Sequence, residues 1–173
     1  MEENQMELFQ VSKYLDVEHT IAKYMFDPVE NPWEVLPSIS IFIEQLGPML
    51  PSEEFEQRGS NVWISKSAVI APTAYIGGPC IIDAGTEVRH CAFIRGSAII
   101  GKNCVIGNST EVKNSIIFDE VQIPHYNYVG DSILGFRSHL GAGAITSNVK
   151  NDKSNVEVNF ALGKMDTKLR KFG

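Results

Sequence analysis

The chain has 173 residues, of which 43% are hydrophobic and 21% are charged, a composition typical of a single globular domain with a real core. Its net charge of −6 argues against a general nucleic-acid binder, although a local site for one small anion stays possible. The N-terminus MEENQMELFQ lacks a basic, apolar leader, and no apolar run reaches the roughly 18–20 residues of a membrane span. We therefore expect neither a signal peptide nor a membrane partner.

The three cysteines favour a reducing compartment. Their number is odd and no CxxC pair occurs, so they form a poor disulfide framework, and we predict a cytoplasmic protein. Cys80 and Cys104 fall at small, inward positions of the repeat described below, whereas Cys91 falls in a turn. Because adjacent residues such as His90 and Cys91 rarely coordinate one ion together, we predict no metal site.

Residues 1–60 do not repeat and are predicted to form a helical cap. The segment Asp16–Phe26 is expected to be one helix, and Asn31 and Pro32 have the types that begin another. A further helical run, SISIFIEQLG, ends at Gly47. We expect these helices to pack on the repeat region, since the end of a solenoid needs a cap.

A six-residue repeat fills residues 61–146. Most hexads place a small residue two positions before a larger, mostly branched one, and no α-helix gives this period because 3.6 does not divide it. The larger positions are Ile64, Ile70, Ile76, Ile82, Val88, Ile94, Ile100, Ile106, Val112, Ile117, Ile123, Val129, Leu134, Leu140 and Thr146.

A coil of three short strands joined by tight corners explains this period. In each strand the small and the larger residue point inward and the residue between them points outward. Three hexads make a coil of eighteen residues, so the fifteen hexads predict a mainly β fold, a single-stranded parallel β-helix of about five coils. Glycine, asparagine and aspartate occupy many predicted corners, including Gly96, Asn103 and Asn114. Residues 147–173 are expected to form a polar loop, a short strand VEVNF and a charged tail MDTKLRKFG.

The outward residues of the first predicted face form an apolar stripe, one residue per coil. A stripe of this length should not stay exposed to water. We expect it to be the interface of a homo-oligomer, and the alternative is that the N-terminal helices cover it. Its members are Trp63, Ile81, Ile99, Ile116 and Ile133.

The third face carries the candidate polar site. Arg95 and Lys113 are one coil apart, so they should stack about 5 Å from each other and repel unless an anion lies between them. The alternative is a pair of solvated cations, with Glu111 as a partner. His125 lies at the far corner of this face, where a neutral imidazole can accept a proton, and Tyr128 points outward between it and the cations. Taken alone, His125 has the simpler interpretation of an ordinary surface histidine.

The stretch from residue 93 to 148 resembles one branch of the hexapeptide-repeat, left-handed β-helix superfamily. The motifs IR, GNSTEVKNS, PHYNYVGDS and GAGAITSN are similar, in order and spacing, to the C-terminal acetyltransferase domain of bifunctional bacterial UDP-N-acetylglucosamine pyrophosphorylase/glucosamine-1-phosphate N-acetyltransferase. They also resemble related archaeal sugar-phosphate nucleotidyltransferases. The resemblance implies a left-handed coil and a cytoplasmic homotrimer that uses acetyl-CoA.

The same resemblance assigns roles to individual residues. It implies that Arg95 and Lys113 hold the phosphate or nucleotide of the substrate and that His125 is the general base for the glucosamine amine. Tyr128 would bind the sugar phosphate, and Asn148 would line the same pocket. Ala142 and His139 would lie on the acyl-donor side.

Three departures from the family pattern limit this transfer. The family has an asparagine at the position of His139, the pyrophosphorylase domain has no counterpart here, and the family continues for further coils that complete the acetyl-CoA site. Three hypotheses therefore stay open. The protein is an N-acetyltransferase acting on an amino-sugar phosphate or sugar nucleotide, a non-catalytic trimer that binds a sugar nucleotide, or a structural partner of a separate nucleotidyltransferase.

Overall fold

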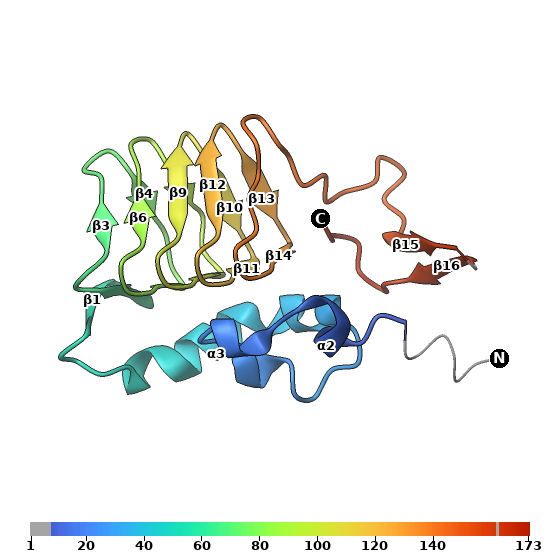
Figure 1. The fold of residues 1–173 in the computed structure, drawn as a ribbon, viewed down its shortest axis with the longest axis horizontal. Helices are drawn as coiled ribbons and strands as arrows, with labels where there is room; N and C mark the ends of the chain where they lie inside the picture. The colour runs from blue at the N-terminus through green and yellow to red at the C-terminus, as the bar shows by residue number, and fades with distance from the viewer. Residues whose placement is uncertain (1–7, 162) are drawn as a thin grey trace.

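The computed structural model describes residues 8–161 and 163–173, and it shows a three-sided coil of β-strands lying on a layer of helices (Figure 1). The helical layer is formed by the N-terminal segment, and in its described part, from residue 8 onward, short 3-10 helices outnumber α-helices. Its elements are α2 (Val11–Tyr14), η1 (Val17–His19), η2 (Lys23–Met25), η3 (Pro32–Ser38), α3 (Ile39–Leu46) and η4 (Gly47–Met49).

Three parallel sheets form the sides of the coil. The first face contains β2 (Val62–Ser65), β5 (Cys80–Ile82), β8 (Ala98–Ile100), β11 (Ser115–Ile117) and β14 (Ile133–Leu134). The second contains β3 (Val69–Ile70), β6 (Glu87–Val88), β9 (Val105–Asn108) and β12 (Gln122–His125). The third contains β4 (Tyr75–Ile76), β7 (Phe93–Ile94), β10 (Glu111–Lys113) and β13 (Tyr128–Gly130).

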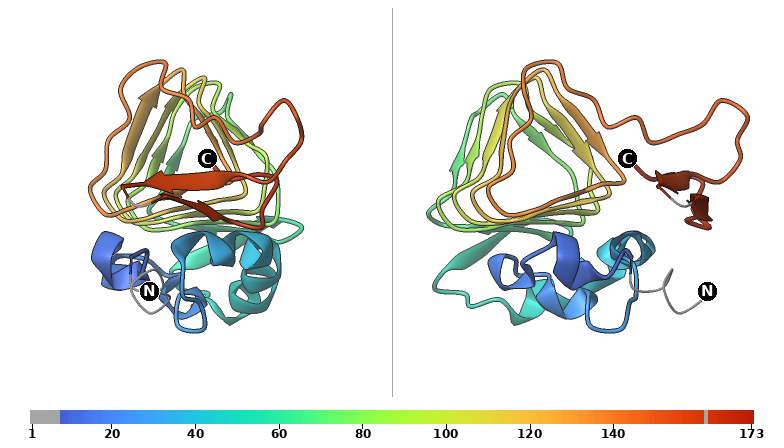
Figure 2. Two further views of the ribbon diagram at one scale, coloured as in Figure 1. Left: turned by 90° about the vertical axis from the view of Figure 1, so that its right-hand side faces the viewer. Right: turned by 45° about the vertical axis from the view of Figure 1, so that its right-hand side comes forward.

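Five coils stack along the axis, in agreement with the sequence. The first face supplies five parallel strands, and the bridges Gln122–His139 and Tyr128–Ile145 add a fifth rung to each of the other faces. Seen from its C-terminal end, the chain turns clockwise while it advances toward the viewer, which is a left-handed coil (Figure 2). The predicted left-handed parallel β-helix is confirmed.

The interior follows the predicted alternation of small and branched side chains. The inward isoleucines and valines of the middle coils are fully or almost fully buried, as are the small partners Ala92 and Ala98. Cys80 and Cys104 occupy two of the small positions, and burial raises the pKa of each thiol to about 12. Both therefore remain protonated at neutral pH and act as small apolar groups, whereas Cys91 is exposed.

The corners depend on left-handed backbone conformations, and these are not confined to glycine, asparagine and aspartate. Gly96, Asn103 and Asn114 do have positive φ, and so do bulkier corner residues such as Tyr126 and Arg137. At these corners the geometry of the coil outweighs the usual preference of bulky residues for negative φ. Gly107 serves another need, since a Cβ at this position would collide with the backbone carbonyl of Pro124 in the next coil.

The N-terminal segment differs from its prediction in two ways. Asp16–Phe26 is not one helix, because it divides into η1 and η2 with the extended residue Thr20 between them. The helix expected after Asn31 does begin at Pro32, but it is a 3-10 helix and Asn31 makes no side-chain capping bond. The run ISIFIEQL forms α3 and ends before Gly47, as predicted.

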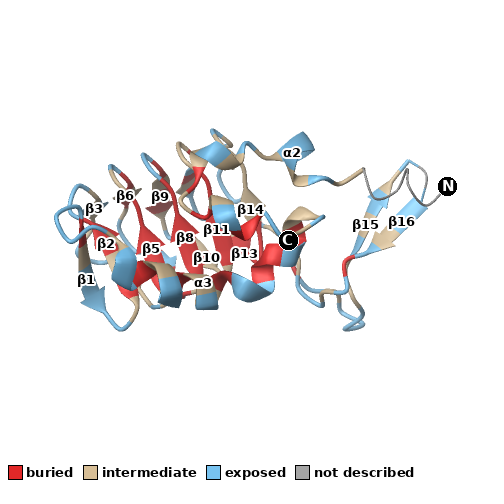
Figure 3. Ribbon diagram, turned by 90° about the horizontal axis from the view of Figure 1, so that it is seen from below, coloured by how far each residue is buried: buried red, intermediate tan, exposed pale blue. Residues whose placement is uncertain are grey.

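The helices cover a side of the coil and not only an end. Viewed from below, α3 crosses the buried strands of the first face (Figure 3), and Ile81, Ile99 and Ile116 have no exposed surface in the single chain. Gly47 packs directly against the indole of Trp63, where any Cβ would clash. The prediction that this stripe is an open subunit interface is wrong, and the alternative of helix coverage is correct.

Two antiparallel pairs flank the parallel coil. β1 (Phe55–Gly59) pairs with β2, so the segment expected to be only helical also contributes an edge strand to the first face. The predicted strand VEVNF corresponds to β15 (Glu157–Phe160), which forms a hairpin with β16 (Gly163–Asp166) in the segment expected to be tail. In the part of the chain that the structure describes, no helix has the length and apolar character needed to cross a membrane.

Enlarging an inward small residue should destabilise the coil. Ala98 is fully buried, so we expect Ala98→Leu to lower the free energy of unfolding by about 1–3 kcal/mol through overpacking. Glu87 points outward and contacts Arg89 at 3.0 Å, and its replacement by Gln should cost less than about 1 kcal/mol. Chemical denaturation of both variants measures the difference, and equal losses would contradict the assignment of inward and outward positions.

Candidate functional site

The candidate residues gather where the third face turns into the first. Arg95 directly follows β7, and Lys113 is the last residue of β10, which pairs in parallel with β7 and β13. The backbone amide of Arg95 donates to the carbonyl of Val112, so the two cations occupy stacked positions in neighbouring coils as predicted. Glu111 and Tyr128 are directly paired on the same face.

Arg95 is not a free cation in this arrangement. Its guanidinium Nη1 lies 2.7 Å from Oε1 of Glu111, and half of the arginine side chain is exposed. The hydrogen bond that Arg95 donates to Glu111, followed by the negative charge of Glu111, raises the pKa of the Arg95 guanidinium above its ordinary value. This pair lies in solvent, where it contributes little to stability.

Lys113 has a more buried partner, Asp131. The ammonium Nζ lies 2.8 Å from Oδ2 of Asp131, and the two side chains are only 17% and 4% exposed. Asp131 also accepts hydrogen bonds from the side-chain amides of Asn114 (2.9 Å) and Asn148. Asn148 in turn donates to the phenol oxygen of Tyr128 at 3.2 Å.

These contacts remove the electrostatic reason to expect an anion between Arg95 and Lys113. Each cation already has a carboxylate partner, so the repulsion between Arg95 and Lys113 does not require a bound anion to offset it. An anionic ligand would have to compete with Glu111 for the exposed guanidinium. It would find Lys113 as a fixed, partly buried charge whose position is set by Asp131.

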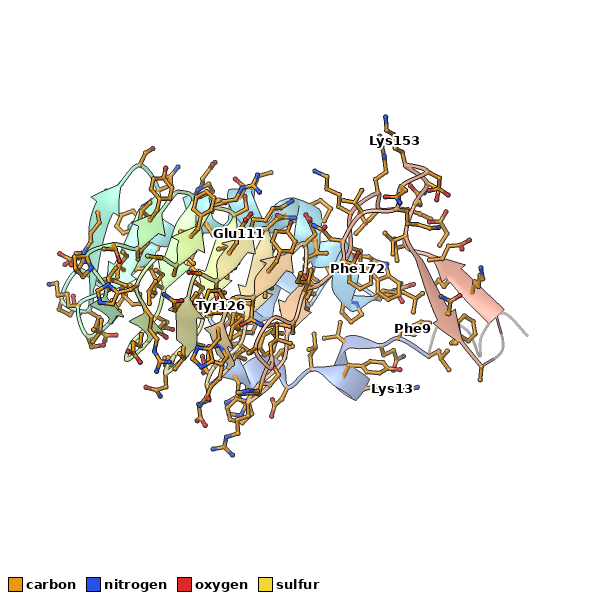
Figure 4. The ribbon with its side chains drawn as sticks, turned by 90° about the horizontal axis from the view of Figure 1, so that it is seen from above. Phe9, Lys13, Glu111, Tyr126, Lys153 and Phe172 are labelled. Carbon is orange, nitrogen blue, oxygen red and sulfur yellow. The ribbon has the colours of Figure 1, made fainter. Side chains whose placement is uncertain are left out.

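His125 and Ala142 meet at the other edge of the third face. His125 ends β12 and its ring is exposed, and the backbone amide of Gly143 donates to its carbonyl at 3.1 Å. This bond stacks the exposed Gly141–Gly143 corner on the His125 corner, and additional Cβ atoms at the two glycines would meet nothing within 4 Å. Figure 4 shows Glu111 on the third face and Tyr126 at the neighbouring corner.

His139 lies elsewhere. It pairs with Gln122 on the second face, where it lines an open depression of about 500 Å³ together with Glu120 and Arg137. The structure therefore brings together Lys113, Tyr128 and Asn148 through hydrogen bonds, with Arg95 stacked beside them. It joins His125 to the corner of Ala142, and it places His139 on the second face, outside the Lys113 group.

The residue that sequence reasoning missed is Asp131. It follows Lys113 by eighteen residues, the same interval that separates Lys113 from Arg95, so extending the spacing by one coil would have located it. The repeat slips by one residue in between, which places Gly130 opposite Lys113 and makes Asp131 reach back from the corner. Within residues 8–161 and 163–173, no group of three histidine, cysteine or acidic side chains is arranged to hold a metal ion.

Removing the Asp131 carboxylate should weaken the whole cluster. We expect Asp131→Ala to lower the free energy of unfolding by about 1.5–3 kcal/mol, because it leaves Lys113 without its partner in a largely buried setting. Glu111→Ala removes the partner of the half-exposed Arg95 and should cost less than about 1 kcal/mol. Denaturant titrations of the two variants provide the comparison, and a larger loss for Glu111→Ala would contradict this ranking.

Comparison with known proteins identifies relatives for most of the chain. It is 38% identical over 151 residues to the bifunctional protein GlmU of Methanococcus maripaludis strain C5, an alignment that covers 86% of this chain and 36% of the relative. It is 32% identical over 150 residues to the bifunctional protein GlmU of Methanocaldococcus jannaschii, with the same coverage. The chain thus spans about a third of the length of these curated relatives.

A structural comparison matches the acetyltransferase domain of PglB from Neisseria gonorrhoeae FA1090, with a TM-score of 0.43, 19% identity and coverage of 49% of this chain and 48% of the other. The family model described as the GMPPB C-terminal domain matches residues 76–163, which is half of the 173-residue chain. This range contains four of the five coils and every candidate residue of the third face. The chain, with its hexapeptide-repeat left-handed β-helix, belongs to the GMPPB C-terminal domain family.

Proposed function

We propose that this domain is an acyl-CoA-dependent N-acetyltransferase that acts on an amino-sugar phosphate or a sugar nucleotide. The observation that supports it best is the hydrogen-bonded group of Lys113, Asp131, Asn148 and Tyr128, which fixes a cation and a phenol on one face. Its similarity to GlmU proteins over most of the chain agrees with a sugar-phosphate role. The free thiol of Cys91 is consistent with work in a reducing cytoplasm.

In this proposal the third face binds the acceptor. Arg95 is half exposed and can exchange Glu111 for a phosphate, a ligand that its planar guanidinium binds well. Lys113 adds a positive charge that Asp131 holds in place. Tyr128 and Asn148 supply neutral hydrogen-bonding groups for the sugar.

The chemistry would take place at the His125 corner. The acceptor amine attacks the thioester carbonyl of acetyl-CoA, a new C–N bond forms, and the imidazole of His125 takes the proton that the nitrogen loses. The C–S bond then breaks and the departing thiolate recovers a proton. The backbone amide groups near Ala142 are the proposed donors to the oxyanion of the tetrahedral intermediate.

A second candidate is a non-catalytic domain that binds a sugar nucleotide or serves as a structural partner. The observation that favours it is the pairing of both cations with carboxylates, which leaves the site electrostatically satisfied without substrate. The two candidates differ in one measurement. Only the first consumes acetyl-CoA when glucosamine 1-phosphate is added to the full chain.

Replacing the proposed base should abolish turnover without abolishing binding. We expect His125→Ala to reduce acetyl-CoA consumption by about 100-fold or more, because a general base acts in the transition state, and to leave glucosamine 1-phosphate affinity within about twofold of wild type. Loss of thioester absorbance measures turnover, and calorimetry measures affinity.

The matched control is His90→Ala. His90 belongs to the same stack of corners as His125, separated from it by Asn108, and its Nδ1 contacts the Thr73 hydroxyl at 2.9 Å. This variant should retain wild-type turnover. Wild-type protein that binds the sugar phosphate without consuming acetyl-CoA would instead support the non-catalytic candidate, and equal losses in both histidine variants would contradict the role of His125.

We also propose a homotrimer, but one that cannot use the first face as its contact. The second and third faces expose Val69, Tyr75 and Ile145 by 62–67% each, and these side chains offer apolar area for subunit contact. Sedimentation velocity should therefore give a trimer mass for the wild type and a smaller species for Tyr75→Lys with Ile145→Lys. A monomeric wild type would overturn the assembly proposal.

A further inference from the structure

A basic groove lies behind the site, on the first-face side of Asp131. Its volume is about 400 Å³, and its walls come from the end of the helical layer's η3, from the loop that follows the last coil and from the last residues of the C-terminal segment. Leu36 and Pro37 line it from the helical layer, and Asn114 and Asp131 line it from the corners of the coil. This size is sufficient for a small organic ligand.

Three cations also line the groove. They are Lys153, Arg170 and Lys171, all exposed, and none has an acidic partner among the residues that the structure describes. Asp131 is the acidic residue of the lining, and its two oxygens already accept from Lys113, Asn114 and Asn148. In a chain with a net charge of −6, an unopposed cluster of this kind favours an anionic ligand.

The backbone holds these cations together. Val149 and Lys171 form an antiparallel bridge, and the amide of Phe172 donates to the carbonyl of Asn148 at 3.1 Å. Lys153 is set by a turn in which its amide donates to the carbonyl of Lys150, with φ of 62°. Figure 4 shows Lys153 on this loop, on the Glu111 side of the molecule and away from Tyr126.

We propose that this groove binds the diphosphate group of a nucleotide. Three flexible or forked cations suit a ligand with two linked phosphates better than a single small anion. The apolar lining from Leu36, Val149 and Leu169 gives the attached organic part a surface to contact. Nucleoside diphosphate sugars and coenzyme A both carry such a diphosphate, and the groove is a second anion site beyond the third-face site.

The test is calorimetric titration of the full chain with inorganic pyrophosphate, UDP and coenzyme A. Pyrophosphate should bind the wild type, and Lys153→Gln with Arg170→Gln should weaken it by roughly 10-fold or more, as expected for lost charge-assisted bonds. The matched control is Lys164→Gln with Lys168→Gln. It removes the same charge from the same C-terminal segment outside the groove, and Lys168 has a φ of 58°, similar to that of Lys153. The control should bind as the wild type does.

Competition identifies the natural ligand. Displacement of pyrophosphate by UDP alone assigns the groove to a sugar nucleotide, and displacement by coenzyme A alone assigns it to the acyl donor. The proposal is overturned if the wild type does not bind pyrophosphate, if the control weakens binding as much as the groove variant, or if neither nucleotide competes. Arg95→Gln should leave groove binding intact, so failure of the third-face proposal would be recognised separately.

Discussion

The structure depends on one constraint: each rung must fit its two inward side chains, in most rungs a small one and a branched one, inside a coil only three strands wide. The backbone hydrogen bonds between coils supply the stacking, but they fit only if each inward position has the right volume. Ala98, Ile100 and their equivalents meet this demand with almost no exposed surface. The outward position and the corner are then free to vary, which is why one repeat carries an apolar stripe, a polar cluster and a histidine corner without change of fold.

This constraint explains how much of the fold could be predicted. The six-residue period specified strands, faces and the stacking of Arg95 over Lys113, because volume inside the coil leaves few alternatives. It did not specify the helical layer. There the short 3-10 helices η1 and η2 replace the single α-helix predicted from residue types, because packing against the coil outweighs helix propensity. Similarly, Tyr126 and Arg137 adopt positive φ because the corner requires it.

The sequence predicted where the candidate site lies, but it did not predict which carboxylate pairs with Lys113. Periodicity placed Lys113 and Tyr128 on one face, yet the partner of Lys113 lies after a slip in the repeat, and only the folded chain brings Asp131 back to it. A carboxylate that is 4% exposed and accepts three side-chain donors is a fixed structural element. The same carboxylate pairs with Lys113 of the third-face site and belongs to a residue that lines the basic groove.

The helical layer also determines the order in which the chain can become native. Residues 32–46 precede the coils in sequence. The surface that they cover is built from β5, β8 and β11, which lie between 48 and 85 residues after Pro32. During synthesis the apolar side of α3 therefore emerges before its docking surface exists, and its contacts are non-local ones that form late. The first coils that leave the ribosome can then pack against α3. Each later coil extends the first face, which the helical layer covers.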